Sequence, residues 1–185
     1  SPMPKFTFGW TNTFRYKNFD LSVFINGSYG NKVYNYLSMK LTHMNSPWTN
    51  QLNAVNGRAQ LVPINPNKVY EDGTMWYNDV SNVMVANPGA SIPRATINDP
   101  NDNDRISDRY IEDGSYIRLK NISLGYTFPK KTIDKLGLSN LRIYANIQNL
   151  LTITGYDGYD PEIGASTSSV NVYGLDNGRY PSPTV

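Results

Sequence analysis

Apolar and polar side chains alternate along four separate segments, and this alternation constrains the fold more than any other feature of the sequence. Successive side chains of a β-strand point to opposite faces, so alternation predicts strands with one apolar and one polar face. In the first segment, residues 5–17, one face carries Phe6, Phe8, Trp10, Phe14 and Tyr16. The other segments are residues 19–30, 115–128 and 140–152. We therefore expect four long strands, with Phe24 out of pattern in the second.

The connections between these segments are alternately short and long. Lys17-Asn18 offers a tight turn, and residues 129–140 offer about one helical turn that Gly137 stops. Residues 31–112 form a long loop rich in Pro, Asn, Asp and Gly. Near its start we expect a short amphipathic helix capped by Asn31. The shared side of that helix would carry Val33, Leu37, Leu41 and Met44.

Strand length and loop alternation together favour an outer-membrane β-barrel. Barrel strands cross the bilayer with about 9–11 tilted residues, and they are joined by short turns on one side and long loops on the other. The apolar face would then meet lipid and the polar face a wet lumen. In a soluble sandwich the apolar face would form the core, but 185 residues would be expected to supply more than four strands.

The composition excludes several classes of function. The chain has no Cys and a single His, so it offers neither a thiolate nor a histidine-cluster metal site. A formal net charge of +2 is too small to argue for nucleic-acid binding. No apolar run reaches the 18 or so residues of a transmembrane helix, but barrel strands never build such a run.

The third segment contains a conflict of phase. Its apolar face is formed by Ile122, Leu124, Tyr126 and Phe128. The seven consecutive residues 122–128 extend for about 23 Å, which at a tilt of about 45° spans only about 16 Å of an apolar band about 25 Å tall. Followed backward, the same face carries Lys120 and Arg118. A bulge near Lys120-Asn121 would swap the phase and turn Ile117 and Leu119 to lipid. Alternatively, the strand leaves the membrane there and the cations snorkel.

Three stretches occur in order in the second half of the chain: DRYIEDGSYIRLKNISLGYTFP, LRIYANIQNLLTITGYDGYDPEIG and GLDNGRYPSPTV. Together they resemble the C-terminal end of the SusC/RagA-type TonB-dependent outer-membrane transporters of Bacteroidetes. The opening PMPKFTFGWTNTFRYKNFDLSVFINGSYGNKVYN is similar to the penultimate-hairpin region of that family. The resemblance covers both ends of the chain well and the middle loop poorly.

This resemblance implies a 22-stranded barrel with an N-terminal plug that draws energy from TonB-ExbB-ExbD. It also implies a SusD-like surface lipoprotein that binds the nutrient, an oligosaccharide or peptide. We expect an all-β chain, with residues 1–185 forming an antiparallel C-terminal segment of the barrel that lacks the plug and the last strand. If the turn at 17–18 is periplasmic, residues 31–112 form an extracellular loop.

The expected function is therefore nutrient import across the outer membrane of a Gram-negative bacterium, in contact with lipid and without a cofactor. A secreted or cell-surface β-rich glycan-binding module is the alternative. An enzyme is disfavoured, because the adjacent carboxylates of Glu112 and Asp113 would point to opposite faces of a strand and could not straddle one sugar ring.

Six residues are candidates for contact with a ligand. Trp48, Trp76 and Tyr77 of the long loop could stack on sugar rings or on hydrophobic peptide side chains, and packing within the loop is the alternative. Arg118, Arg142 and Tyr144 are expected to face the lumen. There they would either tune passage or form a lattice of salt bridges and hydrogen bonds.

Two acidic stretches are weak metal candidates. Asp99, Asn101 and Asn103 alternate as in the start of a calcium loop, but Asp104 and Tyr110 occupy the positions where an EF-hand needs Gly and Glu. The second stretch contains Asp157, Asp160 and Glu162. We expect it to form a solvated loop tip, with calcium or the lid partner as the alternative ligand. The single His43 is expected on a helix surface.

Overall fold

The computed structural model describes residues 1–163 and 173–178. The chain divides into two compact units, of which the first comprises Ser1–Asn35 and Asp108–Val185 and the second comprises Tyr36–Ser107. The four long strands all belong to the first unit. The second unit is the greater part of the long middle segment.

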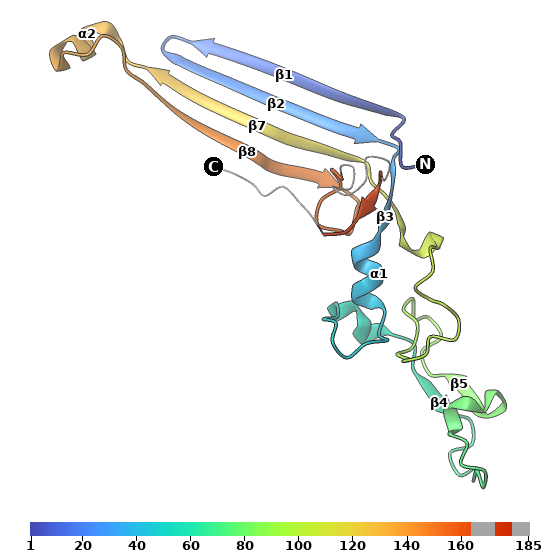
Figure 1. The fold of residues 1–185 in the computed structure, drawn as a ribbon. Coiled ribbons are helices and arrows are strands. Elements are labelled where there is room, and N and C mark those ends of the chain that lie inside the picture. Colours follow the sequence, from blue (N-terminus) through green and yellow to red (C-terminus); the bar gives the residue numbers. More distant parts are fainter. Residues whose placement is uncertain (164–172, 179–185) are drawn as a thin grey trace. The chain divides into compact units, whose positions relative to one another are not determined.

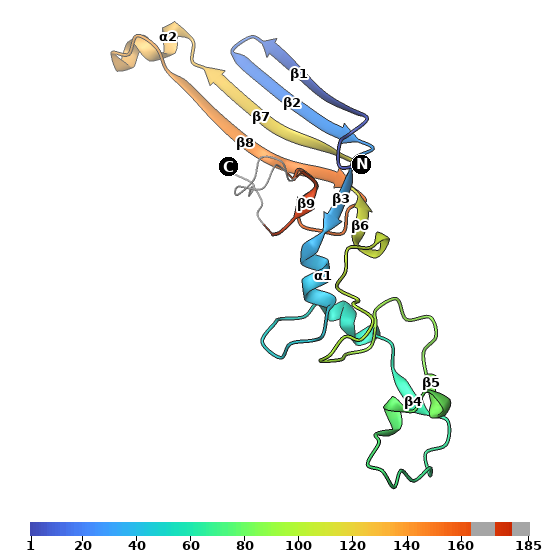
Figure 2. The ribbon, with the colours of Figure 1, turned by 45° about the vertical axis from the view of Figure 1, so that its right-hand side comes forward.

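A four-stranded antiparallel sheet dominates the first unit (Figures 1 and 2), and its strand order is β1-β2-β7-β8. The strands are β1 Phe6–Tyr16, β2 Phe19–Tyr29, β7 Tyr116–Thr127 and β8 Arg142–Thr154. Each begins and ends within two residues of the segment expected from alternation.

Both short connections lie at one end of this sheet (Figure 1). Lys17, with a φ of 54°, forms the tight turn between β1 and β2. Between β7 and β8 the chain forms α2 Lys130–Ile133 and the short 3-10 helix η5 Asp134–Leu136. Gly137, with a φ of 70°, ends this turn, as the sequence predicted.

One face of the sheet is apolar and carries aromatic residues at both ends. At the turn end, the rings of Phe19 and Tyr126 lie 4.6 Å apart and those of Tyr126 and Phe128 lie 4.9 Å apart. At the other end, the rings of Phe6 and Tyr29 lie 5.4 Å apart. Aliphatic rows such as Val23–Ile122–Ile147 lie between these aromatic ends.

The opposite face is polar, and Phe24 is its main exception. Phe24 lies beside Gly9, where a Cβ atom would come within 3.2 Å of the Phe24 ring. The missing side chain of Gly9 therefore gives the ring room on the polar face. On the apolar face of β1 and β2, Asn12 and Gly27 interrupt the otherwise apolar pattern.

A bulge at Lys120 resolves the conflict of phase in β7. Phe24 of β2 pairs with Asn121 and Ile25 pairs with Leu119, which leaves Lys120 without an opposite residue on β2. Leu119 therefore continues the apolar face, and Arg118 turns to the polar face. Of the two interpretations that the sequence left open, the structure selects the bulge.

A small second sheet, β6-β3-β9, also belongs to the first unit. Its strands are β3 Lys32–Asn35, β6 Ile111–Asp113 and β9 Leu175–Asp176. The expected helix start at Asn31 is therefore wrong, because Val33 lies in β3 and is only 1% exposed. Pairing with two strands that are distant in the sequence outweighs the local helical period there.

The second unit contains little regular structure. Its helix, α1 Tyr36–Thr42, buries Met39 and Thr42. A short hairpin pairs β4 Leu61–Pro63 with β5 Val83–Val85. Three 3-10 helices complete the unit: η1 Asn53–Gly57, η2 Trp76–Asn78 and η3 Val80–Asn82. Besides η5, the first unit contains the 3-10 helix η4 Asp108–Tyr110, which precedes β6. Among the described residues, none of the helices has the length and apolar character needed to cross a membrane.

Candidate functional site

The polar face of the four-stranded sheet carries the arginines that the sequence singled out. Arg142 pairs with Asp20 on β2, with Nη2 and Oδ2 2.6 Å apart. The pair lies over Gly125, where any Cβ atom would collide with both side chains. The Arg142 guanidinium also lies 5.4 Å from the centre of the Tyr144 ring. Arg142 therefore belongs to a lattice of polar contacts rather than offering a free charge.

Arg118 is the most buried charged side chain on this face, with only 2% of its side chain exposed. Its Nε donates to the Thr152 hydroxyl at 2.8 Å, and its Nη1 donates to Glu162 Oε2 at 2.6 Å. Its Nη2 forms an ion pair with Asp160. Lys120, the bulge residue, contacts the same Glu162 oxygen at 2.6 Å. We call Arg118, Lys120, Asp160 and Glu162 the clasp.

The clasp corrects the expectation that residues 157–162 form a solvated loop tip. Asp160 is only 6% exposed, and the segment that follows β8 folds back onto the polar face through it. Asp157, by contrast, is exposed, and its backbone N–H donates to Glu112 at 3.0 Å. The two basic residues of β7 neutralise the acidic cluster, so Asp160 and Glu162 are not free to act as cation ligands.

The other weak metal candidate is also occupied by contacts within the chain. The Asp99 carboxylate accepts from the Asn103 backbone N–H at 2.6 Å and lies 2.9 Å from His43 Nε2. His43 is therefore not a surface residue, because its side chain is only 10% exposed in this contact. Burial raises the pKa of Asp99, but the bonds from Asn103 and His43 together outweigh it and hold that pKa below its usual value. The described residues contain no cluster of three or more potential metal ligands.

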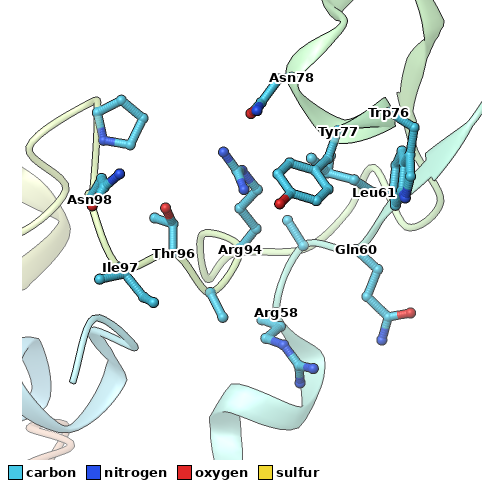
Figure 3. Close-up of a pocket in the computed structure, with 13 residues that line it drawn as sticks. Arg58, Gln60, Leu61, Trp76, Tyr77, Asn78, Arg94, Thr96, Ile97 and Asn98 are labelled. Atoms are coloured by element: carbon cyan, nitrogen blue, oxygen red, sulfur yellow. The ribbon is translucent and has the colours of Figure 1, made fainter. Parts of the chain in front are cut away.

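An open hollow in the second unit brings together two of the three aromatic candidates (Figure 3). It has a volume of about 930 Å³, and its lining includes Trp76, Tyr77, Asn78, Arg58 and Arg94. The rings of Trp76 and Tyr77 meet edge to face, 5.7 Å apart at 79°. Trp48 does not join them and is 92% exposed, so it does not pack within the loop either.

Sequence reasoning missed the two arginines of this hollow. Arg58 precedes β4, and Arg94 lies in the irregular segment after β5. A single bridge between Arg58 and Ile92 brings these two segments together. No local period marks either residue, because both lie outside helices and strands. Only their shared position in the folded loop identifies them.

A network around Asp79 supports one wall of the hollow. Its carboxylate accepts from Lys68 Nζ at 2.5 Å, from the Tyr70 hydroxyl at 2.9 Å and from the Ser81 hydroxyl at 2.6 Å. These contacts, with Lys68 the largest, hold the pKa of Asp79 well below its usual range. Asp79 also caps η3 by accepting from the Ser81 backbone N–H.

We expect Asp79→Asn to loosen the chain around Lys68 and to increase trypsin cleavage after that residue severalfold. The amide keeps the shape but loses the charge that holds the Lys68 ammonium. Asp72→Asn is the matched control, because the Asp72 carboxylate makes local bonds to the backbone and hydroxyl of Thr74, two residues on. Equal cleavage of the two variants would contradict this role for Asp79.

The lowered pKa of Asp79 fixes the direction in which its contribution to stability changes with pH. A carboxylate whose pKa is lowered by folding contributes stability that is fully present above its unfolded pKa, about 3.9. The contribution of Asp79 should therefore be constant at neutral pH and decline as the pH falls below about 4.

Comparison with known proteins relates the whole chain to one class of protein. It is 36% identical, over 98% of its length, to TonB-dependent receptor P3 of Formosa agariphila. It is 29% identical, over 94% of its length, to TonB-dependent receptor SusC of Bacteroides thetaiotaomicron. The chain spans only 15% and 13% of these two proteins. No family model matches the chain.

A solved structure supports the fold separately. The structure of the RagAB peptide transporter matches 99% of this chain and 16% of the transporter chain, with a TM-score of 0.62 and 19% identity. At 19% identity the match is evidence for the fold but not for the function. The mostly antiparallel arrangement described above is thus the fold of a segment of that transporter.

Proposed function

Because the chain is homologous to part of the SusC/RagA-type TonB-dependent receptors, we propose that its four long strands are adjacent strands of an outer-membrane barrel wall. The receptor would import oligosaccharides or peptides together with a SusD-like surface lipoprotein, driven by TonB-ExbB-ExbD through a plug. These receptors are transporters and not enzymes, in agreement with the prediction that the chain is not an enzyme.

The observation that carries this proposal is the uncovered apolar face of the sheet. Trp10 is 56% exposed and Phe14 is 55% exposed, although both lie on that face. A sandwich would cover such side chains with a second sheet, but the described residues provide none over this face. Lipid is the covering that the homology supports, and the glycan-binding module is correspondingly disfavoured.

The dimensions of the face agree with a bilayer. Phe6 and Tyr16, at opposite ends of β1, are ten residues apart, which is about 33 Å of strand at about 3.3 Å per residue. A tilt of about 45° turns this length into a height of about 23 Å, close to the apolar band of about 25 Å in barrels. The aromatic clusters at the two ends of the face correspond to the two interfacial girdles.

Single cysteines at Trp10 and Thr11 test the proposal. The chain has no Cys of its own, and both positions are exposed in the chain by itself. In a cysteine-free form of the intact receptor in lipid vesicles, Thr11→Cys should react with a water-soluble thiosulfonate. Trp10→Cys should react at least about tenfold more slowly, because lipid excludes the charged reagent. Equal rates, or a faster reaction at position 10, would rule out the barrel wall.

Import itself is tested in cells. A strain that lacks the intact receptor should lose uptake of its nutrient, and the wild-type receptor should restore that uptake. Uptake assays with labelled oligosaccharides and labelled peptides distinguish the two substrate classes. Unchanged uptake of both classes without the receptor would contradict the proposed function and would leave the barrel test unaffected.

A further inference from the structure

The hollow in the second unit is positively charged, and the described residues contribute no acidic side chain to its lining. Arg58 and Arg94 are among its lining residues, and neither Asp nor Glu is. Within the described residues, the Arg58 guanidinium donates a single long bond, to the Val55 carbonyl at 3.4 Å. Arg94 is half-buried and has no ion pair or hydrogen bond within the described part of the chain. A half-buried guanidinium without a counter-charge is costly, so an anion that fits there would be held favourably.

The surroundings of Arg94 indicate what kind of anion would fit. In Figure 3 the Arg94 side chain extends toward the Tyr77 ring and the Asn78 amide, whereas the Arg58 guanidinium extends away from them. The planar fork of a guanidinium matches the paired oxygens of a carboxylate or a sulfate. The Trp76 and Tyr77 rings meet edge to face. Their flat faces therefore point in different directions, and a sugar ring could lie against either one.

The remaining lining favours a sugar over a peptide side chain. The amides of Gln60, Asn78 and Asn98 and the hydroxyl of Thr96 offer donors and acceptors for hydroxyl groups. Leu61 and Ile97 are the larger aliphatic side chains of the lining. The volume of about 930 Å³ lies near the upper end of the range for small-molecule sites, about 300–1,000 Å³.

We propose that this hollow binds an acidic oligosaccharide. The carboxylate or sulfate group of one sugar contacts Arg94, and the ring lies against Tyr77 or Trp76. Neighbouring hydroxyl groups bond to the amides of the lining. This inference rests on the proposed function, because it assigns the long loop of the importer to capture of substrate.

The test measures binding of labelled oligosaccharides to the intact receptor in detergent micelles by fluorescence polarisation. An oligogalacturonate carries carboxylates, a carrageenan-derived oligosaccharide carries sulfates, and maltoheptaose is the neutral control. Arg94→Gln should weaken binding of at least one acidic probe by roughly tenfold or more. Arg94→Lys keeps the charge but not the fork, and should recover only part of the affinity. Arg105→Gln is the matched control, since Arg105 is exposed in the same unit outside the hollow.

Loss at Arg94→Gln without loss at Arg105→Gln supports the inference, and the probe affected decides between carboxylate and sulfate. Failure of the wild type to bind either acidic probe, or equal binding by wild type and Arg94→Gln, would overturn it. Competition by an oligoglutamate peptide as effective as the best sugar would also overturn it. Uptake of oligosaccharides and peptides, measured in cells that carry the same variants, reports separately on the proposed function.

Discussion

Replacing Arg118 by Met is expected to cost about 3–5 kcal/mol of the free energy that holds residues 155–163 on the polar face of the sheet. The expected readout is hydrogen exchange of that segment in the intact receptor. About 1.4 kcal/mol corresponds to a factor of ten, so protection should fall by at least about 100-fold. No other single side chain of the clasp should have so large an effect.

The cost arises from what the substitution leaves behind. Arg118 is 2% exposed, and its partner Asp160 is almost as buried. Removing one member of a buried pair leaves the other charge without compensation, and that penalty exceeds the net value of the pair itself. Glu162 loses one of its two cations but keeps Lys120 at 2.6 Å. The stranded charge is therefore that of Asp160.

This reasoning predicts that a second substitution reverses the effect of the first. The double variant Arg118→Met with Asp160→Leu removes both buried charges, and much of the lost protection should return. Arg142→Met is the matched control, because the Arg142–Asp20 pair is 40% and 30% exposed and such pairs contribute at most about 1 kcal/mol. If Arg142→Met and Arg118→Met opened the segment equally, burial of the clasp would not be the cause.

The strands of the sheet could be predicted because their signal is local. When apolar and polar residues alternate over ten or more positions, the pattern identifies a strand with one buried or lipid-covered face, and no knowledge of its partner strands is required. The bulge could be anticipated only as one of two solutions. Alternation reveals the conflict at Lys120, but the register against β2 and β8 decides it, and register depends on partner strands.

The contacts that form the sites could not be predicted in the same way. Arg118 meets Asp160 across 42 residues, and His43 meets Asp99 across 56. Alternation places Arg118 on a face of β7, but no period identifies its partner, because Asp160 lies in the segment after β8; His43 and Asp99 both lie outside helices and strands. The helix expected after Asn31 begins only at Tyr36, as α1, and Val33 lies in β3 instead, for a related reason. The apolar spacing that includes Val33 does fit a helix. However, β3 pairs with β6 and β9, and this pairing places Val33 in a strand.

Ile122→Lys is expected to destabilise the intact receptor in lipid by about 2–4 kcal/mol, the cost of a cation near the middle of a bilayer. Ile122 lies opposite Val23 and Ile147 on the apolar face. It is four residues from the aromatic cluster at Tyr126, which is about 9 Å of membrane depth at a tilt of about 45°. That depth places the ammonium too far from either interface for it to reach water easily.

Two lysine controls separate depth from the general effect of a new charge. Ile143→Lys, opposite Tyr126 on the same face, lies at the aromatic cluster and should cost only about 0–1 kcal/mol. Ser123→Lys introduces the same cation next to Ile122 on the polar face, where a wet lumen would hydrate it. Each variant is unfolded with guanidinium chloride in lipid vesicles. The midpoint of each unfolding curve, analysed with one common m-value, gives the difference in unfolding free energy between that variant and the wild type. In a soluble sandwich the cost of each lysine would depend on local packing and not on membrane depth. Equal losses of unfolding free energy at positions 122 and 143 would therefore argue against lipid as the covering of this face.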